Sequence, residues 1–314
     1  MKQATSTVYR GQASRRTFTS EWHNLVLGFQ HLLAMYSGDV LVPLLIGHYL
    51  HFSALQMTYL VSIDIFMCGV ATLLQLKQTP LTGIGLPVVL GCAVQAVTPL
   101  ESIGGKLGIT YMYGAIIAAG IFVFLIAGFF ARLKRFFPPV VTGSLITIIG
   151  FTLVPVGFQD LGGGTPTAAS FGNPTNLLVG FLTIIIILVI SAFARGFMKS
   201  IAILIGILVA SFIAGGLGQV SLTPVSEAAW FHTPQLFFFG VPHFNLSAMI
   251  TMMLVSLTTM IESTGVFFAL SDITGRQLTT KDLERGYRAE GIAAVLGGLF
   301  NTFPYSTFSE NVGV

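Results

Sequence analysis

A few polar side chains lie inside long apolar stretches of this sequence, and one of them is an acid. Glu262 stands in the middle of Thr258–Gly265, and no lysine or arginine follows it before Arg276. Without a local counter-ion, burial disfavours the charged carboxylate, so Glu262 could take up a proton near neutral pH. A carboxylate can also accept two N–H hydrogen bonds from a planar solute. Proton-linked binding of a planar molecule fits this pattern, and so does a neutral acid bonded to a neighbouring helix.

Two further groups suit the same chemistry. The Gln95 amide donates and accepts hydrogen bonds at once, which suits a solute with alternating N–H and C=O groups, although it could instead join two helices. Glu310 follows a break at Pro304, where a short helix would restart. The unpaired N–H groups and the dipole of a helix N-terminus favour negative charge there. Glu310 is therefore either a second binding group or the cap of its own half-helix.

Four more ionisable groups lie in or at the edges of the apolar stretches. His31 fits a proton relay and a structural hydrogen-bond partner equally well. Glu290, two residues after Arg288, fits either a salt bridge or a proton relay. Asp39 and Asp64 are expected to pair with helix ends or to lie in each other's surroundings. Ionisable groups inside a membrane are costly and are therefore functional candidates by default.

Motifs of catalysis and metal binding are missing or stand in the wrong context. Gly162–Gly164 and Gly83–Gly85 lack the strand-then-helix setting and the lysine of a phosphate loop. No His-Glu-x-x-His, Ser/His/Asp or paired-cysteine pattern occurs. Cys68 and Cys92 both lie in apolar runs, which argues against a disulfide framework or a zinc site. We therefore expect neither an enzyme nor a protein with a metal or another cofactor.

The composition indicates what kind of protein contains these polar and ionisable groups. Of the 314 residues, 54% are hydrophobic and only 9% are charged, whereas soluble domains carry about 25% charged residues. The formal net charge of +3 is too small to indicate a nucleic-acid partner. The composition therefore predicts a protein that crosses a lipid bilayer several times.

Apolar runs of about 20 residues mark helices that can cross a bilayer. We expect such spans at Asn24–Gly47, Ser53–Leu76, Gly83–Leu100, Thr110–Phe130, Pro139–Phe158, Asn176–Phe193, Ser200–Leu217, Asn245–Leu270 and Tyr287–Phe303, and a tenth beginning near Pro304. Of the fifteen lysines and arginines, all but Lys106 fall on one side of the alternating loops. Because cytoplasmic loops are rich in these residues, this bias predicts a cytoplasmic N-terminal tail over residues 1–22.

The spans are expected to form an inverted repeat. Residues 23–218 hold seven spans, an odd number, so a second copy that starts at residue 245 after an extracytoplasmic connection (219–244) would enter from the opposite side. The third segment of each copy is interrupted by glycine or proline, at Gly83–Pro99 and from Asn301 onward. Paired interruptions of this kind indicate a binding site near the middle of the membrane, although proline kinks in packed helices would look the same.

Three motifs carry a resemblance to a known family. Gln30–Tyr36 with Val42–Leu44 resembles the first-span signature of the nucleobase–ascorbate transporters, also called xanthine/uracil permeases. Gly83–Gly91 and Asn301–Phe308 resemble the two broken segments of the xanthine and uric acid permease branch. The resemblance covers nearly the whole chain.

The resemblance implies an all-α polytopic fold of two inverted seven-span repeats (7+7), in which each broken segment adds a short strand and a half-helix. Spans 1–4 (core) and 5–7 (gate) would fill residues 23–218, and residues 245–314 would hold core spans 8–10. It also implies a multi-pass protein of the cell membrane and a possible homodimer. The expected activity is import of a purine base, xanthine or uric acid, coupled to H⁺ or less readily to Na⁺.

The resemblance also implies roles for individual residues, which are expectations of the family pattern. The substrate-binding positions are Glu262, Glu310, Gln95, Ser309, Val94 and Asn311, and the proton-coupling positions are Glu262, His31 and Glu290. Val94 replaces an aromatic residue that is common in the family, and Asp39 is an added acid. Because the chain stops within the motif around Asn311, we expect a fragment that lacks the last spans.

Alternatives to a purine permease remain open. Glu310 stands where the purine branch usually has glutamine and is more typical of uracil permeases, so a uracil or other pyrimidine permease is the nearest alternative. An anion exchanger or a channel of similar architecture is a more distant one. Acidic groups such as Glu262 argue against an anionic substrate.

Overall fold

The computed structural model describes residues 18–133, 139–163, 171–218 and 233–313, and most of them are helical. In chain order the elements are α1 (Phe18–Asp39), α2 (Leu41–Tyr49), α3 (Ala54–Leu76), β1 (Leu90–Cys92), the 3-10 helix η1 (Val94–Ala96), α4 (Val97–Leu107), α5 (Ile109–Arg132), α6 (Pro139–Leu161), α7 (Pro174–Phe193), α8 (Phe197–Ser200), α9 (Ala202–Gly216), α11 (Leu246–Thr274), α12 (Thr280–Phe300), β2 (Tyr305–Thr307) and the 3-10 helix η3 (Glu310–Gly313).

The helices follow the predicted apolar spans closely. In the described part of the chain, five helical stretches are long and apolar enough to cross a membrane: Asn24–Tyr49, Ala54–Leu76, Ile109–Arg132, Pro174–Phe193 and Leu246–Thr274. The first of them is divided between α1 and α2, with Val40 at the junction. A mostly helical protein with several candidate spans is therefore confirmed, whereas the total number of spans stays a prediction. Residues 1–17 of the predicted tail and 219–232 of the predicted connection lie outside the described residues.

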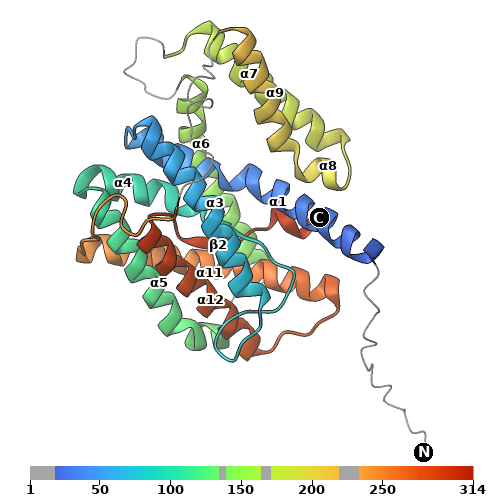
Figure 1. The fold of residues 1–314 in the computed structure, drawn as a ribbon, viewed down its shortest axis with the longest axis vertical. Helices are drawn as coiled ribbons and strands as arrows, with labels where there is room; N and C mark the ends of the chain where they lie inside the picture. Colours follow the sequence, from blue (N-terminus) through green and yellow to red (C-terminus); the bar gives the residue numbers. More distant parts are fainter. Residues whose placement is uncertain (1–17, 134–138, 164–170, 219–232, 314) are drawn as a thin grey trace, which may run out of the picture.

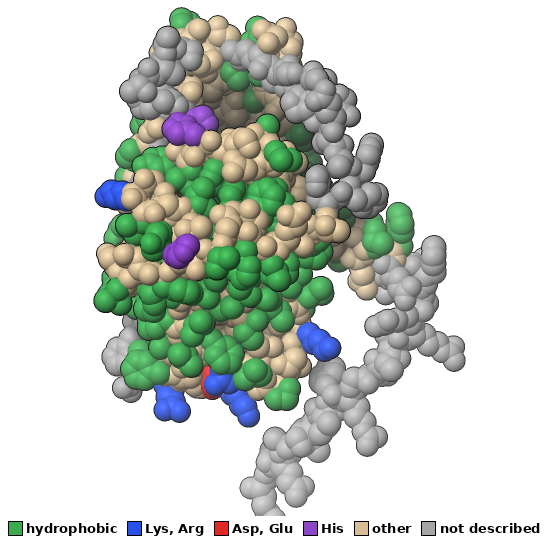
Figure 2. Space-filling view, turned by 60° about the vertical axis from the view of Figure 1, so that its left-hand side comes forward, with side chains coloured by type: hydrophobic (Ala, Val, Ile, Leu, Met, Phe, Trp, Pro, Cys, Tyr) green, Lys and Arg blue, Asp and Glu red, His purple; other side chains and the backbone are tan. Residues whose placement is uncertain are grey.

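The outer surface is apolar, as a lipid environment requires. Figure 2 shows one face that is covered largely by hydrophobic side chains, with lysine and arginine gathered toward its lower end. On α5, for example, Leu125 is 73% exposed and Phe129 is 67% exposed. Exposed side chains of this size would be unfavourable in water but are favourable against lipid tails.

Four helices form the bundle that holds the two broken segments. In Figure 1, α3, α5, α11 and α12 lie together around the strands, whereas α7 and α9 lie side by side some way from that bundle. Helices α5 and α12 touch at Gly120 and Gly291. A Cβ atom built on Gly120 would lie 2.7 Å from the Gly291 carbonyl oxygen, and one built on Gly291 would lie 2.8 Å from the Gly120 carbonyl oxygen. The backbones can approach this closely because neither residue has a side chain.

The two broken segments pair with each other at the centre of the bundle. Strands β1 and β2 are antiparallel, with Leu90 opposite Thr307 and Cys92 opposite Tyr305. Gly91 lies opposite Ser306, and the Phe308 ring occupies the space that a Cβ atom on Gly91 would fill. Each strand runs on into a short helical turn, η1 or η3. The expected short strand is therefore present in each broken segment, and the half-helix is present after β1 as α4. After β2 the described residues reach only η3, so the second half-helix stays a prediction.

Polar side chains at the start of α12 hold the loop that leads into the first broken segment in place. Asp282 accepts hydrogen bonds from the backbone N–H of Thr279 (2.9 Å) and from the Gln78 amide (3.0 Å), and it pairs with Arg276 and Arg285. Arg276 in turn donates to the Gly85 carbonyl oxygen at 2.6 Å. The carboxylate of Asp282 therefore connects the start of α12 to the loop before β1.

This carboxylate should make stability depend on pH. Burial raises the pKa of Asp282, but hydrogen bonds from Thr279 and the Arg285 guanidinium outweigh it and hold that pKa below its usual range. A lowered pKa means that the stabilisation is present above the unfolded-state pKa of about 4 and is lost as the pH falls through the folded-state value. We expect Asp282→Asn to cost about 1–2 kcal/mol at pH 7.

Thermal melts of the purified protein test this expectation. The difference in melting temperature between the wild type and Asp282→Asn should be clear at pH 7 and should shrink below pH 4, where the wild-type carboxylate also becomes neutral. An equal difference at pH 7 and pH 3 would show that the charge of Asp282 is not what stabilises the loop.

Candidate functional site

The structure brings Gln95 and Glu262 together where the broken segments meet. Gln95 lies in η1, directly after β1, and its Nε2 donates a hydrogen bond to Glu262 Oε2 at 2.8 Å. Glu262 lies near the middle of α11, across from η1. The sequence predicts both residues as binding groups, and they are direct neighbours although 167 positions separate them.

The hydroxyl groups of Ser256 and Thr259, which precede Glu262 on α11, donate hydrogen bonds to backbone carbonyl oxygens of their own helix. The Thr259 hydroxyl donates to the Ser256 carbonyl oxygen (2.8 Å), and the Ser256 hydroxyl donates to the Met253 carbonyl oxygen (2.7 Å). Such bonds let serine and threonine lie inside a membrane bundle at little cost. Glu262 instead receives its hydrogen bond from another segment of the chain, and the hydroxyls of Ser263 and Thr264 also contact other elements.

Glu290 lies next to the same site and is connected to it through β2. It is buried on α12, and its Oε1 accepts a hydrogen bond from the Thr307 hydroxyl of β2 at 2.8 Å. The Thr307 backbone N–H donates to the hydroxyl of Ser263, the residue that follows Glu262. The second oxygen of Glu290 is buried without a hydrogen-bond partner among the described residues. The sequence does not predict Thr307 or Ser263 as site residues, although Thr307 lies inside the second broken-segment motif.

The salt bridge with Arg288, one of the two alternatives for Glu290, does not form in the structure. Arg288 pairs instead with Glu284, at 2.6 Å and four positions before it on α12. Residues four apart lie on the same face of a helix, whereas residues two apart do not face each other. Glu290 consequently points into the bundle while Arg288 does not. The proton relay, the other interpretation that the sequence leaves open for Glu290, stays a prediction.

His31 and Asn311 connect α1 to the end of the second broken segment. The Asn311 amide donates to the His31 carbonyl oxygen at 2.7 Å, and its nitrogen lies 3.2 Å from His31 Nδ1. The Asn311 Oδ1 atom is buried and has no hydrogen-bond partner among the described residues. A buried acceptor without a partner is uncommon in a folded protein, so this atom is free to receive a donor from a ligand.

The remaining predicted positions lie at the rim of the site. Glu310 begins η3 and is exposed, and the Ser309 hydroxyl is 3.4 Å from its carboxylate. Val94 precedes Gln95 in η1 and is half-buried. Glu310 and Glu262 lie close enough for their charges to repel each other. The junction of the broken segments therefore holds carboxylates, amides and short-helix N–H groups, which suit a planar solute with both donors and acceptors.

Asp39 and Asp64 lie elsewhere in the bundle. Both are fully buried, and each contacts a cysteine side chain. The expectation that they lie in each other's surroundings is therefore confirmed.

The family of the chain follows from comparison with known proteins. A family model described as "Permease family", named for xanthine and uracil permeases, matches residues 23–314. The chain belongs to this family. Permeases carry solutes across membranes, so the protein is a transporter rather than an enzyme. Together with the candidate spans, family membership indicates a multi-pass protein of the cell membrane.

Several known proteins resemble the permease over most of its length. The uric acid permease PucK of Bacillus subtilis (strain 168) is 54% identical over 298 residues, which cover 94% of this chain and 69% of PucK. A xanthine permease of the same organism is 53% identical, over 92% of this chain and 66% of its own. A "Probable uracil permease" of Haemophilus influenzae is 30% identical, over 91% of this chain and 66% of its own. The permease chain thus spans about two thirds of the length of these relatives.

One solved structure supports the fold independently of sequence. The transmembrane domain of the cyanobacterial bicarbonate transporter BicA matches with a TM-score of 0.65, over 95% of this chain and 77% of that domain. The two sequences are only 13% identical, so the likeness concerns the fold alone.

Proposed function

We propose that the permease imports a purine base, xanthine or uric acid, by proton symport. One observation carries the proposal: the Gln95 amide and the Glu262 carboxylate are joined at 2.8 Å at the junction of the two broken segments. Identities of 53–54% with a xanthine permease and a uric acid permease support a purine as the substrate. The 30% identity with a uracil permease favours the pyrimidine alternative much less.

In the proposed complex the base lies between α11 and the short helices. Gln95 orients the carboxylate through Oε2, so that Oε1 of Glu262 can accept an N–H of the base. Glu310 accepts a second N–H, and the backbone N–H groups of η1 and η3 face the carbonyl oxygens of the base. Charge-assisted hydrogen bonds of this kind contribute about 1.5–3 kcal/mol each. Val94, Ser309 and Asn311 complete the rim of the site.

Proton coupling is proposed to act through Glu262 and Glu290. Their carboxylates lie close enough to interact electrostatically, and Thr307 and Ser263 connect the two along β2. His31, held by Asn311, is the other candidate for the relay. Transport is coupled only if the base and the proton together favour a state that neither favours alone.

The architecture proposed for the whole protein is two inverted seven-span repeats with a cytoplasmic N-terminus. The antiparallel pairing of β1 with β2 supports this arrangement, because equivalent strands of an inverted pair run in opposite directions. Of the helices of the predicted gate, α7 and α9 lie apart from the predicted core in Figure 1, whereas α6 lies along α11. A homodimer is proposed by analogy with the family.

Uptake measurements test the substrate and the coupling ion. Cells that express the full-length permease should accumulate radiolabelled xanthine or uric acid in preference to uracil, and a protonophore should abolish the uptake. A preference for uracil would favour the pyrimidine alternative. Undiminished uptake with the protonophore would exclude proton symport and leave sodium coupling or facilitated diffusion.

Glu310 distinguishes the two substrate classes directly. If the substrate is a purine, Glu310→Gln should retain at least about a third of the xanthine uptake, because the family's purine branch usually has glutamine at this position. If the substrate is uracil, the same change should lose most of the uptake, since the charge-assisted hydrogen bond is lost. Competition by unlabelled xanthine or uracil, measured in the variant and in the wild type, gives the preference for each base from one assay. Loss of xanthine uptake in Glu310→Gln would contradict the expectation that a glutamine amide oxygen can replace the Glu310 carboxylate in purine binding.

A further inference from the structure

A second group of reactive side chains lies outside the proposed substrate site. It consists of two carboxylates and two thiols, the acid–thiol cluster: Asp39, Asp64, Cys68 and Cys92. Their possible ligand atoms all lie within 4.8 Å of one another. Cys68 and Cys92 are the only cysteines of the chain. No sequence pattern indicates that Cys68 and Cys92 lie together, because the two cysteines lie on separate elements.

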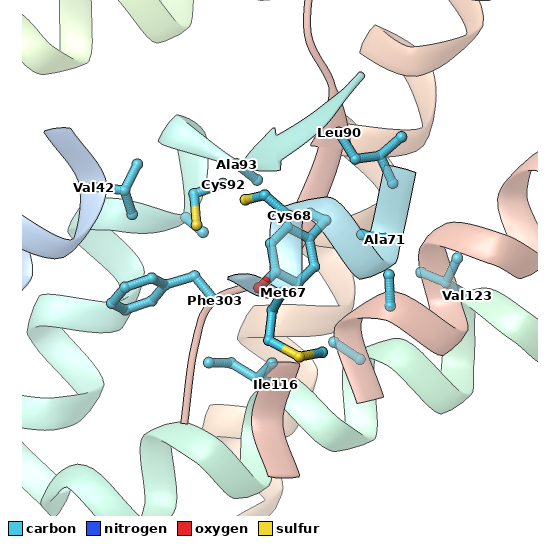
Figure 3. Close-up of a cluster of buried hydrophobic side chains, with 14 of the residues drawn as sticks. Val42, Met67, Cys68, Ala71, Leu90, Cys92, Ala93, Ile116, Val123 and Phe303 are labelled. Atoms are coloured by element: carbon cyan, nitrogen blue, oxygen red, sulfur yellow. The ribbon is translucent and has the colours of Figure 1, made fainter. Parts of the chain in front are cut away.

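Three elements supply the acid–thiol cluster. Asp39 is the last residue of α1, and Cys92 is the last residue of β1. Asp64 and Cys68 lie four positions apart on α3, so they share one face of that helix. All four side chains are fully buried. Figure 3 shows Cys68 on α3 and Cys92 beside β1 among apolar neighbours such as Leu90 and Phe303.

The distances within the cluster suit a tetrahedral metal site. Cys68 Sγ lies 3.1 Å from each Asp39 oxygen, and Cys92 Sγ lies 2.9 and 3.1 Å from the two Asp64 oxygens. With Zn–S bonds of about 2.3 Å and Zn–O bonds of about 2.0–2.2 Å, the donors of a tetrahedral zinc site lie roughly 3.3–3.8 Å apart. To hold the ion, the sulfur–oxygen pairs need to move outward by about half an ångström, and donors as far apart as 4.8 Å need to move inward by about 1 Å.

A second observation is that the two buried acids have no positive partner. In the described part of the chain the ion pairs all lie at the α12 end, among Arg276, Asp282, Glu284, Arg285 and Arg288. Asp39 and Asp64 therefore lie side by side in an apolar interior with no cationic side chain in an ion pair. Buried carboxylates are normally paired with a cation or bound to a metal.

We propose that the acid–thiol cluster binds one thiophilic divalent metal ion, of the class of Zn²⁺. Two thiolates favour zinc over magnesium or calcium, which prefer oxygen ligands. Two carboxylates and two thiolates carry the same formal charge as the four thiolates of a Cys₄ zinc site. The Cys92 backbone N–H donates to Asp39 Oδ1 at 2.7 Å and so orients that ligand from outside the metal shell.

The bound ion would fasten the first broken segment to the bundle. It would join the end of α1, the middle of α3 and the last residue of β1. Because β1 pairs with β2 and continues into η1, a metal at this point would hold the strand that precedes Gln95. The proposal concerns metal binding and does not depend on which solute is transported.

Metal analysis of the purified full-length permease tests the proposal. Zinc is supplied during expression, because the four ligands are buried in the folded protein, and free metal is removed by gel filtration. We expect about one zinc per chain in the wild type, and less than a tenth of that in the Cys68→Ser/Cys92→Ser double variant. Asp272→Asn, which removes an exposed carboxylate at the end of α11, should keep the full amount.

A cobalt experiment on the wild type tests the proposal even if the double variant misfolds. Protein produced with Co²⁺ should show a thiolate-to-cobalt charge-transfer band, which should weaken in each of the single variants Cys68→Ser and Cys92→Ser. Wild-type protein without metal and without the band would show that the cluster holds protons only and would overturn the proposal. Zinc retained in the double variant would overturn it too, since the ion would then be bound elsewhere.

Discussion

Glu262→Gln is expected to reduce uptake of the purine base to the background level of cells without the permease. The substitution keeps the size of the side chain and leaves a partner for the Gln95 amide at 2.8 Å. It removes the negative charge and with it the ability to exchange a proton. Losing one charge-assisted hydrogen bond to the base should weaken binding roughly 10- to 150-fold, and losing the proton should abolish accumulation as well.

Two measurements separate these effects. Binding of labelled xanthine to purified protein reports the hydrogen bond alone, whereas uptake into energised cells reports binding and coupling together. Exchange of labelled for unlabelled base needs no net proton movement. It should therefore persist in Glu262→Gln when xanthine is supplied well above its weakened affinity.

The matched control is Glu284→Gln. Glu284 undergoes the same chemical change, but it pairs with Arg288 on α12 and takes no part in the proposed site. Its uptake should stay within about twofold of wild type, since partly exposed ion pairs contribute only about 0–1 kcal/mol. Both variants must reach the membrane in equal amounts, as measured by quantitative blotting. Wild-type uptake by Glu262→Gln would remove Glu262 from the site.

The elements of the fold could be predicted because their signals are local. A run of about 20 apolar residues is enough to mark a helix such as α5 or α11, since the bilayer fixes its length. The break before β1 could likewise be located from its glycines and proline, Gly83, Gly85 and Pro87. The division of the first span at Val40 is not predicted, although Ser37, Gly38 and Asp39 interrupt the apolar run directly before it.

The contacts of the site are harder to predict because they join distant segments. Gln95 and Glu262 can each be selected from residue type and position, but their direct hydrogen bond depends on how η1 packs on α11. The salt bridge with Arg288, one of the two alternatives that the sequence leaves open for Glu290, does not form for the same reason. Arg288 is its near neighbour in sequence, whereas Thr307, its actual partner, arrives from another element.

The acid–thiol cluster is the clearest example of this limit. Two isolated cysteines in apolar runs do not resemble any spaced metal motif. Only the packing of β1 against α3 and the end of α1 brings Cys92 to Cys68 and to the two acids. A sequence pattern can reveal a site built within one segment, but not one assembled from three.

Gly291→Leu is expected to prevent α12 from packing against α5. A Cβ atom on Gly291 would lie 2.8 Å from both the Gly120 carbonyl oxygen and the Phe124 backbone nitrogen. These are backbone atoms of another helix, so no change of rotamer relieves the overlap and the two helices must separate. Overpacking of this kind costs about 3 kcal/mol or more, which lowers the melting temperature of a chain of this length by roughly 5 °C or more.

Gly69→Leu provides the control on another helix. Gly69 is exposed on α3, and a Cβ atom there would meet nothing within 4 Å, so the same substitution should leave the melting temperature within a few degrees of wild type. Fluorescence-detected gel filtration and thermal melts in detergent measure both variants. Gly291→Ala should fall between them, since alanine adds the Cβ atom but nothing beyond it. A wild-type melting temperature for Gly291→Leu would mean that the two helices are not in backbone contact.

The position of Gly291 also connects this packing to transport. Gly291 directly follows Glu290, whose Oε1 accepts the 2.8 Å hydrogen bond from Thr307 of β2. Moving α12 away from α5 by the width of a side chain would therefore displace Glu290 from the strand. If Gly291→Ala still folds, we expect its uptake to fall more than its stability, with the protonophore-sensitive part lost first. If uptake instead fell only in proportion to the amount of folded protein, the α5–α12 contact would serve folding alone, and Glu290 would tolerate displacement.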